Sequence, residues 1–308
     1  MAPELIIPTS QHCPGRVAYR GSGIFNKIKT QFQKFNLIDR AKESPFGQFW
    51  RASTLTFSSV LFHQLMLHKM KVDFERAEEV CFYVGRNETI FGVVEFALIT
   101  GLNFSQGPTE DEKSAYSRSD RLLNLYFNKS KSIKLDQLQD QFLRCETPED
   151  VYRLGLCLFV DAVLLGHENN IHISTDILKF VEDLEFFFKI PWGKLSFAKL
   201  MKTLQRDLVK QFDKMLSQDV QRDYRYTAYG FAPALQYWAY EVILEVGKNY
   251  SFNHGINFPR MLSWSSKDEV GKKDFATLFS KRVRVFLLCC KYIFLLAFTN
   301  IYFAFCIE

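Results

Sequence analysis

Apolar residues recur every three or four positions along most of this chain, which is the spacing of an amphipathic helix. The repeat is clear in residues 24–38, 46–70, 196–216 and 233–246, and we expect a helix in each stretch. A break at Ser44-Pro45 separates the first two, because proline interrupts helices. The third stretch is the most regular, with apolar side chains at positions 197, 201, 204, 208, 212 and 215.

One short segment alternates instead. Val80, Phe82 and Val84 are separated by polar or small neighbours and are followed by a turn signal at Gly85-Arg86-Asn87. This pattern predicts a β-hairpin over residues 79–91. A helical repeat follows directly, and Gly101 stands where a left-handed helix C-cap belongs.

A second helix signal is local rather than periodic. Thr147-Pro148 offers a cap residue and a proline at the first helical position, with two acids beside the positive helix end. The helix predicted to follow, residues 151–165, is apolar nearly all round and should be central and buried. We expect another helix from Ser174 to residue 189, a break at Pro191-Trp192-Gly193, and a polar loop over residues 105–120.

These patterns predict a mainly α fold, a multi-helix globular domain with a short β-hairpin near residues 79–91. Residues 1–22 are rich in Pro, Gly and Ser and show no period, which predicts a disordered lead-in. The 31 phenylalanines indicate a core dominated by aromatic packing.

The net charge of +5 lies at the ends of the chain. Residues 1–45 carry +4 and residues 281–308 carry +3, which leaves −2 for residues 46–280. A phosphate-binding surface needs cations concentrated on the folded body, so nucleic-acid binding is not indicated. The seven cysteines form no CxxC pair and no metal-ligand spacing, which fits a reducing compartment.

The sequence contains no phosphate loop and no known catalytic motif. His63 and His68 are five positions apart, so on a helix they point about 140° from each other and cannot share a metal ion. Asp161, within an apolar run, is expected to pair with a buried Arg or a backbone donor, although it could also act as an acid or base. A hydrolase with Asp161 or His254 at its centre would need a concave polar pocket around either residue.

Six blocks of the sequence resemble a known family. They are ESPFGQFWRASTLTFSSVLFHQLMLHKM, EEVCFYVGRNETIFGVVEFALITGLNF, VYRLGLCLFVDAVLLG, KIPWGKLSFAKLMKTL, YRYTAYGFAPALQYWAYEVI and PRMLSW. In this order they resemble the plant domain of unknown function DUF1985 over residues 20–265, with EFALITGL and the Pro-Trp-Gly block as the most specific parts. The hairpin and the helix after it also resemble, more weakly, the plant mobile domain of transposon origin.

The resemblance implies a transposon-derived domain, often found ahead of a Ulp1-like cysteine protease domain. It brings no catalytic residues, because the protease His, Asp and Cys belong to that separate downstream domain. We expect that the protease domain is absent here and that its activity should not be transferred. The chain then divides into the lead-in (1–22), a DUF1985-like helical domain (23–265), a basic linker (266–284) and a hydrophobic tail (285–307).

The tail has two interpretations. Residues 285–307 carry one charge, Lys291, and as a helix would span about 34 Å, enough to cross a bilayer. Three basic residues precede them, which would keep the body of the protein in the cytoplasm. A run rich in Phe, Leu and Ile is also what translated intron sequence looks like, so the tail is either a membrane anchor or an artefact of the gene model.

Together these observations predict a non-catalytic, intracellular protein-interaction module without cofactor or metal. The partner would be an unknown protein, with membrane tethering through residues 285–307 if the tail is genuine. We expect exposed aromatics such as Trp192, Tyr224 or Tyr226 to carry the binding surface, although Trp192 suits the core equally well. The alternatives are a nucleic-acid-associated module, which would favour the nucleus, and a remnant of a protease polyprotein.

Overall fold

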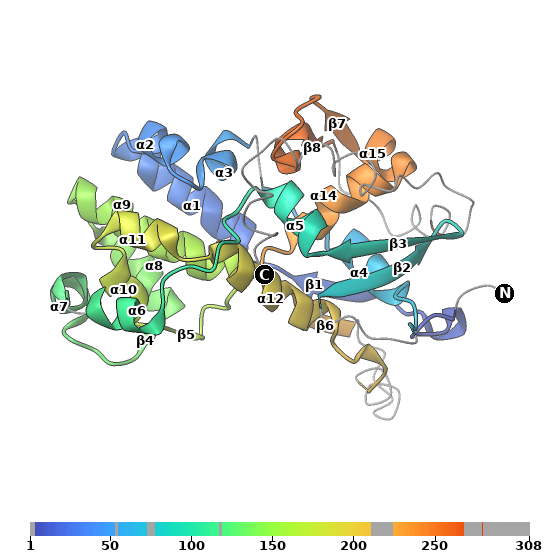
Figure 1. The fold of residues 1–308 in the computed structure, drawn as a ribbon, viewed down its shortest axis with the longest axis horizontal. Helices are drawn as coiled ribbons and strands as arrows, with labels where there is room; N and C mark the ends of the chain where they lie inside the picture. Colours follow the sequence, from blue (N-terminus) through green and yellow to red (C-terminus); the bar gives the residue numbers. More distant parts are fainter. Residues whose placement is uncertain are drawn as a thin grey trace.

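The helices account for most of the fold (Figure 1). The computed structural model describes residues 4–52, 55–72, 78–116, 119–210, 224–267 and 279. In chain order the α-helices are α1 (Gly21–Lys34), α2 (Ile38–Glu43), α3 (Gly47–Arg51), α4 (Ser59–Leu67), α5 (Val93–Thr100), α6 (Glu110–Tyr116), α7 (Arg121–Phe127), α8 (Leu135–Arg144), α9 (Pro148–Leu158), α10 (Asp176–Phe180), α11 (Leu184–Lys189), α12 (Trp192–Leu204), α14 (Pro233–Val242) and α15 (Leu244–Tyr250). Three further turns are η1 (Thr9–Gln11), η2 (Phe159–Leu164) and η3 (Arg260–Ser263).

The strands form small two-stranded sheets. They are β1 (Gly15–Ala18) with β6 (Tyr224–Thr227) in parallel, and the antiparallel pairs β2 (Glu79–Val84) with β3 (Asn87–Gly92), β4 (Ile133–Lys134) with β5 (His172–Ile173), and β7 (Ser251–Asn253) with β8 (Trp264–Ser266). The prediction of a mainly α fold with a short hairpin is therefore confirmed.

The predicted hairpin is formed by β2 and β3. Val84 pairs with Asn87 across the turn, where Gly85 and Arg86 both have positive φ. Such a turn matches the right-handed twist of the two strands. Every second residue of β2 is buried, as the alternation predicts.

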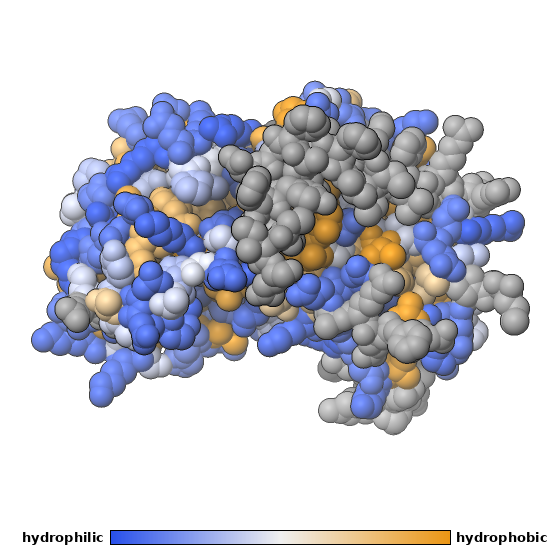
Figure 2. Space-filling model, viewed as in Figure 1, coloured by the Kyte–Doolittle hydropathy of each residue, from blue (hydrophilic) through white to orange (hydrophobic). Residues whose placement is uncertain are grey.

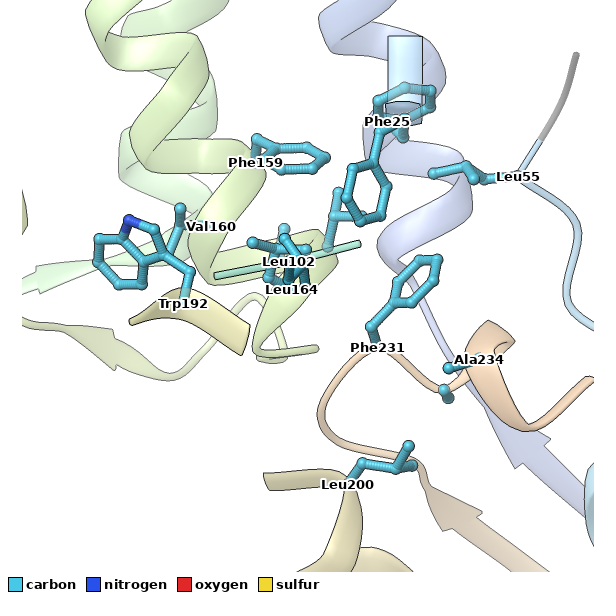
Figure 3. Close-up of a cluster of buried hydrophobic side chains, with 14 of the residues drawn as sticks. Phe25, Leu55, Leu102, Phe159, Val160, Leu164, Trp192, Leu200, Phe231 and Ala234 are labelled. Carbon is cyan, nitrogen blue, oxygen red and sulfur yellow. The ribbon is translucent and has the colours of Figure 1, made fainter. Parts of the chain in front are cut away.

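Helices α1–α3 and α6–α11 lie on one side of the molecule, and α4, α5, α14, α15 and the hairpin lie on the other (Figure 1). Helix α12 lies between these two groups. The core joins them and is aromatic, as the phenylalanine content predicts. Figure 3 shows Phe159 facing Phe25 in this core, and the two ring centroids are 5.9 Å apart. Phe159 also packs against Phe46, Phe49 and Trp50, and each such pair adds about 1 kcal/mol beyond its buried area.

The central helix is buried as predicted but not regular throughout. Helix α9 begins at Pro148 after the cap position Thr147, then gives way at Phe159 to the π-helical turn η2. In that turn the amide of Leu165 donates to the carbonyl of Val160, five residues earlier. A π-helical turn inserts one extra residue and often marks a position with a special role.

Several predicted helices are shorter than expected. The stretch 24–38 is divided into α1 and α2 at Asn36, whose positive φ ends the first helix. The stretch 46–70 is divided into α3 and α4, and Ser58 caps α4 by accepting a hydrogen bond from the amide of Leu61. The stretch 174–189 is divided into α10 and α11 in the same way, with Asp183 as the cap. Local caps decide these boundaries, whereas the apolar repeat continues across them.

Two predictions about irregular segments need correction. The segment 105–120, predicted as a loop, contains α6, which Thr109 and Glu112 cap reciprocally through hydrogen bonds of 2.7–3.2 Å. The described part of the predicted disordered lead-in contains β1, which pairs with β6, and Ile7, which is buried. The N-terminal segment therefore contributes to the fold.

Among the described residues, no helix combines the length and apolar character needed to cross a bilayer. The predicted tail, residues 285–307, lies outside the described residues, as does nearly all of the predicted basic linker.

Candidate binding groove along α12

Helix α12 starts where the sequence predicts a break. Trp192, the first residue of the helix, is buried, and its indole nitrogen donates to the carbonyl of Phe187 (2.8 Å). Gly193 lies against Phe104, so closely that a Cβ atom would stand 2.5 Å from the ring. These two contacts fix the N-terminal end of α12.

The middle of α12 is held by a buried polar junction. The Ser196 hydroxyl donates to the carbonyl of Leu164 (2.6 Å) and accepts from the amide of Phe231 (3.1 Å). Gly230 has φ +75°, and a Cβ there would stand 2.5 Å from backbone atoms of Leu200 and Ser196. This close approach and the positive φ favour glycine at position 230, where α12 packs closely against the segment before α14.

The C-terminal end of α12 is capped by a buried lysine. The ammonium group of Lys69 donates to the carbonyls of Leu204 (2.6 Å) and Arg206 (3.2 Å). The negative end of the helix dipole stabilises a cation at this position. Burial nevertheless lowers the pKa of Lys69 to about 8, with a small opposing effect from Asp207.

An open groove follows the outer face of α12. Its volume is about 590 Å³, and it is lined by Glu78, Val93, Phe104, Lys194, Phe197, Ala198, Met201, Lys202 and Gln205. The floor is apolar, with Phe104 and Phe197 in ring contact at 6.5 Å. Figure 2 shows hydrophobic residues reaching the surface in the region that α5, α12 and the hairpin occupy in Figure 1.

The edge of the groove formed by α12 is positively charged. Lys194 and Lys202 are both exposed, and in the part of the chain that the structure describes neither pairs with a carboxylate. Glu78 lies on the opposite wall. The groove therefore has an apolar floor between a basic edge and an acidic one.

Asp161 is buried in η2, and its partner is His167 rather than an Arg. A hydrogen bond of 3.1 Å joins Oδ1 of Asp161 to Nδ1 of His167. The second oxygen, Oδ2, has no hydrogen-bond partner among the described residues. Burial raises the pKa of Asp161, and the bond from His167 offsets part of that rise.

A cysteine lies one helical turn before this pair, but it is not suited to nucleophilic attack. The thiol of Cys157 is buried and donates to the carbonyl of Ile177 (3.6 Å). Burial raises its pKa well above the ordinary value, and nearby acids raise it further. A reactive cysteine needs the opposite environment.

The other candidate histidines have separate structural partners. Nε2 of His254, in the loop after β7, lies 2.8 Å from the hydroxyl of Ser265. His63 is buried, with Nε2 2.9 Å from the carbonyl of Cys13 and Nδ1 3.3 Å from the hydroxyl of Tyr226. Neither Asp161 nor His254 lines the groove. Within the described ranges, no group of three His, Cys, Asp or Glu residues is placed to hold a metal ion.

Two of the three aromatic residues predicted to carry the binding surface are not exposed. Trp192 and Tyr226 are buried, at 6% and 7% exposure, and the side chain of Tyr224 lies outside the described part. Trp192 is thus a core residue, the second of its two interpretations. The apolar stripe on α12 includes Phe197 and Met201, which line the groove, but it does not reveal the groove because Glu78, Val93 and Phe104 come from distant parts of the chain.

The central blocks of the sequence match a family model. Residues 69–203 match the model of DUF1985, a domain of unknown function. The match confirms the family suggested by the sequence over a shorter stretch than the expected 20–265. No curated protein and no solved structure matches the chain.

The matched stretch, residues 69–203, contains nearly the whole groove. It begins at Lys69, which caps α12, and ends one residue before the end of that helix. Every residue that lines the groove except Gln205 lies inside it. Nearly all of the groove lining therefore lies in the part of the chain that resembles DUF1985.

Proposed function

We propose that this chain is a non-catalytic module that binds a segment of a protein partner in the groove along α12. The groove carries the proposal because it combines an open shape, an apolar floor and charged edges. Its volume of about 590 Å³ is within the range of well-formed ligand sites. Apolar floors with polar rims are typical of protein-binding surfaces.

The ionisable side chains of the groove support binding rather than catalysis. They are Glu78, Lys194 and Lys202, and none of them is hydrogen-bonded to another ionisable group in the described part of the chain. An acid–base site needs such a pair in mutual contact. The buried pair of Asp161 and His167 lies elsewhere, in η2 and the segment after it.

A nucleic-acid role is the second candidate, favoured by the two exposed lysines at the groove edge. Two cations beside an apolar floor and a carboxylate give weak attraction for a phosphate backbone. The net charge of −2 over residues 46–280 also disfavours binding to a phosphate backbone. We therefore place protein binding first.

Photo-crosslinking tests the proposal in the full chain. Benzoylphenylalanine at Gln205, the end of the groove, should give a protein adduct of defined mass in cells, whereas the same group at the exposed Leu125 on α7 should not. Ala198→Trp fills the groove and should abolish the adduct. The proposal is contradicted if no adduct forms at Gln205 or if the adduct persists in Ala198→Trp. An adduct that is sensitive to nuclease also argues against it.

We also propose an intracellular location. The described cysteines, Cys13, Cys81, Cys145 and Cys157, are free thiols, which supports a reducing compartment. Membrane tethering through residues 285–307 stays a prediction. Mass spectrometry of the native C-terminus tests it, since peptides ending at Glu308 are expected if the tail is genuine.

A further inference from the structure

The spacing of the groove residues on α12 points to the shape of the partner. The helix contributes positions 194, 197, 198, 201, 202 and 205, which are separated by three and one in alternation. Lys194, Phe197, Ala198 and Met201 occupy positions i, i+3, i+4 and i+7, and the same pattern repeats from Ala198 to Gln205. Four residues at these positions form the hole that receives a side chain from a packed helix.

We infer that the groove binds an amphipathic helix with acidic residues along the side that faces α12. This inference rests on the proposed function and specifies the partner. The two holes lie four residues apart on α12, about 6 Å along the helix axis. A partner helix would fill them with two apolar side chains three or four positions apart.

The floor of the groove suits such side chains. Ala198 is exposed and is the smallest residue of the lining, so it leaves room between the two lysines. Met201 lies beside it, and its flexible thioether adapts to side chains of different shape. Phe197 packs against Phe96 and Phe104 (ring centroids 5.4 and 6.5 Å apart), which keeps the floor in place.

The charged residues of the groove determine which charges the partner helix carries. Lys194 and Lys202 are eight positions apart, about 12 Å along α12, so two acidic residues seven or eight positions apart on the partner would reach both. Glu78 on the opposite wall disfavours acids on the other side of the partner helix. A partner helix that fits the groove therefore carries acidic residues on the side that faces α12 and basic or uncharged residues on the opposite side.

A peptide series tests this inference on the full chain. The probe is a fluorescein-labelled 18-residue peptide, capped at both ends, with leucines at helical spacing, glutamates on the α12 side and glutamines elsewhere. Matched peptides replace the glutamates with glutamine or lysine, or the leucines with serine. Fluorescence anisotropy should show about tenfold tighter binding of the glutamate peptide than of the lysine peptide, since two ion pairs are exchanged for two repulsions.

Charge exchange in the protein provides the matched control. Lys194→Glu/Lys202→Glu should reverse the preference in favour of the lysine peptide, whereas Lys131→Glu/Lys248→Glu, at exposed positions away from the groove, should leave it unchanged. Ala198→Trp and the serine peptide should each abolish binding.

The outcomes separate the partner from the site. Equal binding of the glutamate, glutamine and lysine peptides, lost in Ala198→Trp, overturns the acidic partner and leaves the groove as a docking site. No binding of any peptide at millimolar concentration overturns the helical partner. If the crosslink at Gln205 also fails, the proposed function falls with it.

Discussion

Replacing Lys69 with methionine should change how the stability of the fold depends on pH. Lys69 is 4% exposed, and its ammonium group has two carbonyl partners at the end of α12. Burial disfavours its charged form, so its pKa of about 8 in the folded protein lies below the ordinary value of 10.5. Methionine has nearly the same length and carries no proton to titrate.

The sign follows from proton linkage. Between pH 8 and 10.5 the unfolded chain holds the Lys69 proton more tightly than the folded chain, so the contribution of this residue to stability grows as the pH rises. With pKa values of about 8 and 10.5, the gain from pH 7 to pH 9.5 is about 2 kcal/mol. At pH 7 the lost hydrogen bonds of the variant, about 1 kcal/mol each, are largely offset by removal of the buried charge.

Urea unfolding followed by tryptophan fluorescence measures this effect. The wild type and Lys69→Met should have similar unfolding free energies at pH 7, and the wild type should be about 2 kcal/mol more stable at pH 9.5. Tyrosines and cysteines also titrate in this range, but they are common to both proteins and cancel in the difference. Lys71→Met is the control, because it removes an exposed lysine whose ion pair with the exposed Glu4 contributes less than about 1 kcal/mol. A difference between wild type and Lys69→Met that stays constant from pH 7 to 9.5 would refute the reasoning.

Three further predictions concern stability. Arg121→Met should lower the free energy of urea unfolding by about 2–4 kcal/mol, because the buried Asp150 loses a two-point ion pair of 2.5 and 3.1 Å. The additional substitution Asp150→Asn should recover part of this loss, and an equal loss in the double variant would argue against the ion pair. Gly230→Ala should lower the stability measured by thermal unfolding by about 3 kcal/mol or more. Gly255 has a similar φ but open space around it, so Gly255→Ala should lower the stability by about 1 kcal/mol. Equal losses would show that backbone strain, and not the close contacts of Gly230, causes the effect. Burial lowers the pKa of His68 to about 4, so the neutral form stabilises the fold above pH 6.5 and this contribution is lost as the pH falls. Relative to His68→Phe, the wild type should lose about 2 kcal/mol of unfolding free energy from pH 7 to 4.5, and parallel pH profiles of the two proteins would contradict this.

The sequence predicted elements best where a local signal agreed with the apolar pattern. The hairpin of β2 and β3 combines alternation with a Gly-containing turn, and α9 combines a Thr-Pro start with an apolar run. Where caps act inside a continuous repeat, as at Ser58, the pattern alone gave one helix instead of two. Helix α6 was missed for the opposite reason, since it has a cap but no buried residue.

The groove and the buried pair depend on contacts between distant parts of the chain. Asp161 was recognised as a buried acid, but its partner His167 was not, because His167 turns back toward it only after the left-handed Gly166, where the amide of His167 donates to the carbonyl of Asp161 (3.0 Å). The exposed side of α12 becomes a groove because Glu78, Val93 and Phe104 come from the hairpin, α5 and the loop after it. A spacing of 194, 197, 198, 201, 202 and 205 was visible in the sequence, but nothing local indicated a second wall beside it.

The parallel pairing of β1 with β6 has a consequence for how the chain folds as it is made. Gly15 pairs with Tyr224, so the first strand waits for a partner that leaves the ribosome roughly 210 residues later. At ordinary rates of translation this delay is roughly 10–40 s, during which one strand edge stays open. The nascent protein therefore completes this pairing only after residues 69–203, the stretch that matches the DUF1985 model, have been synthesised.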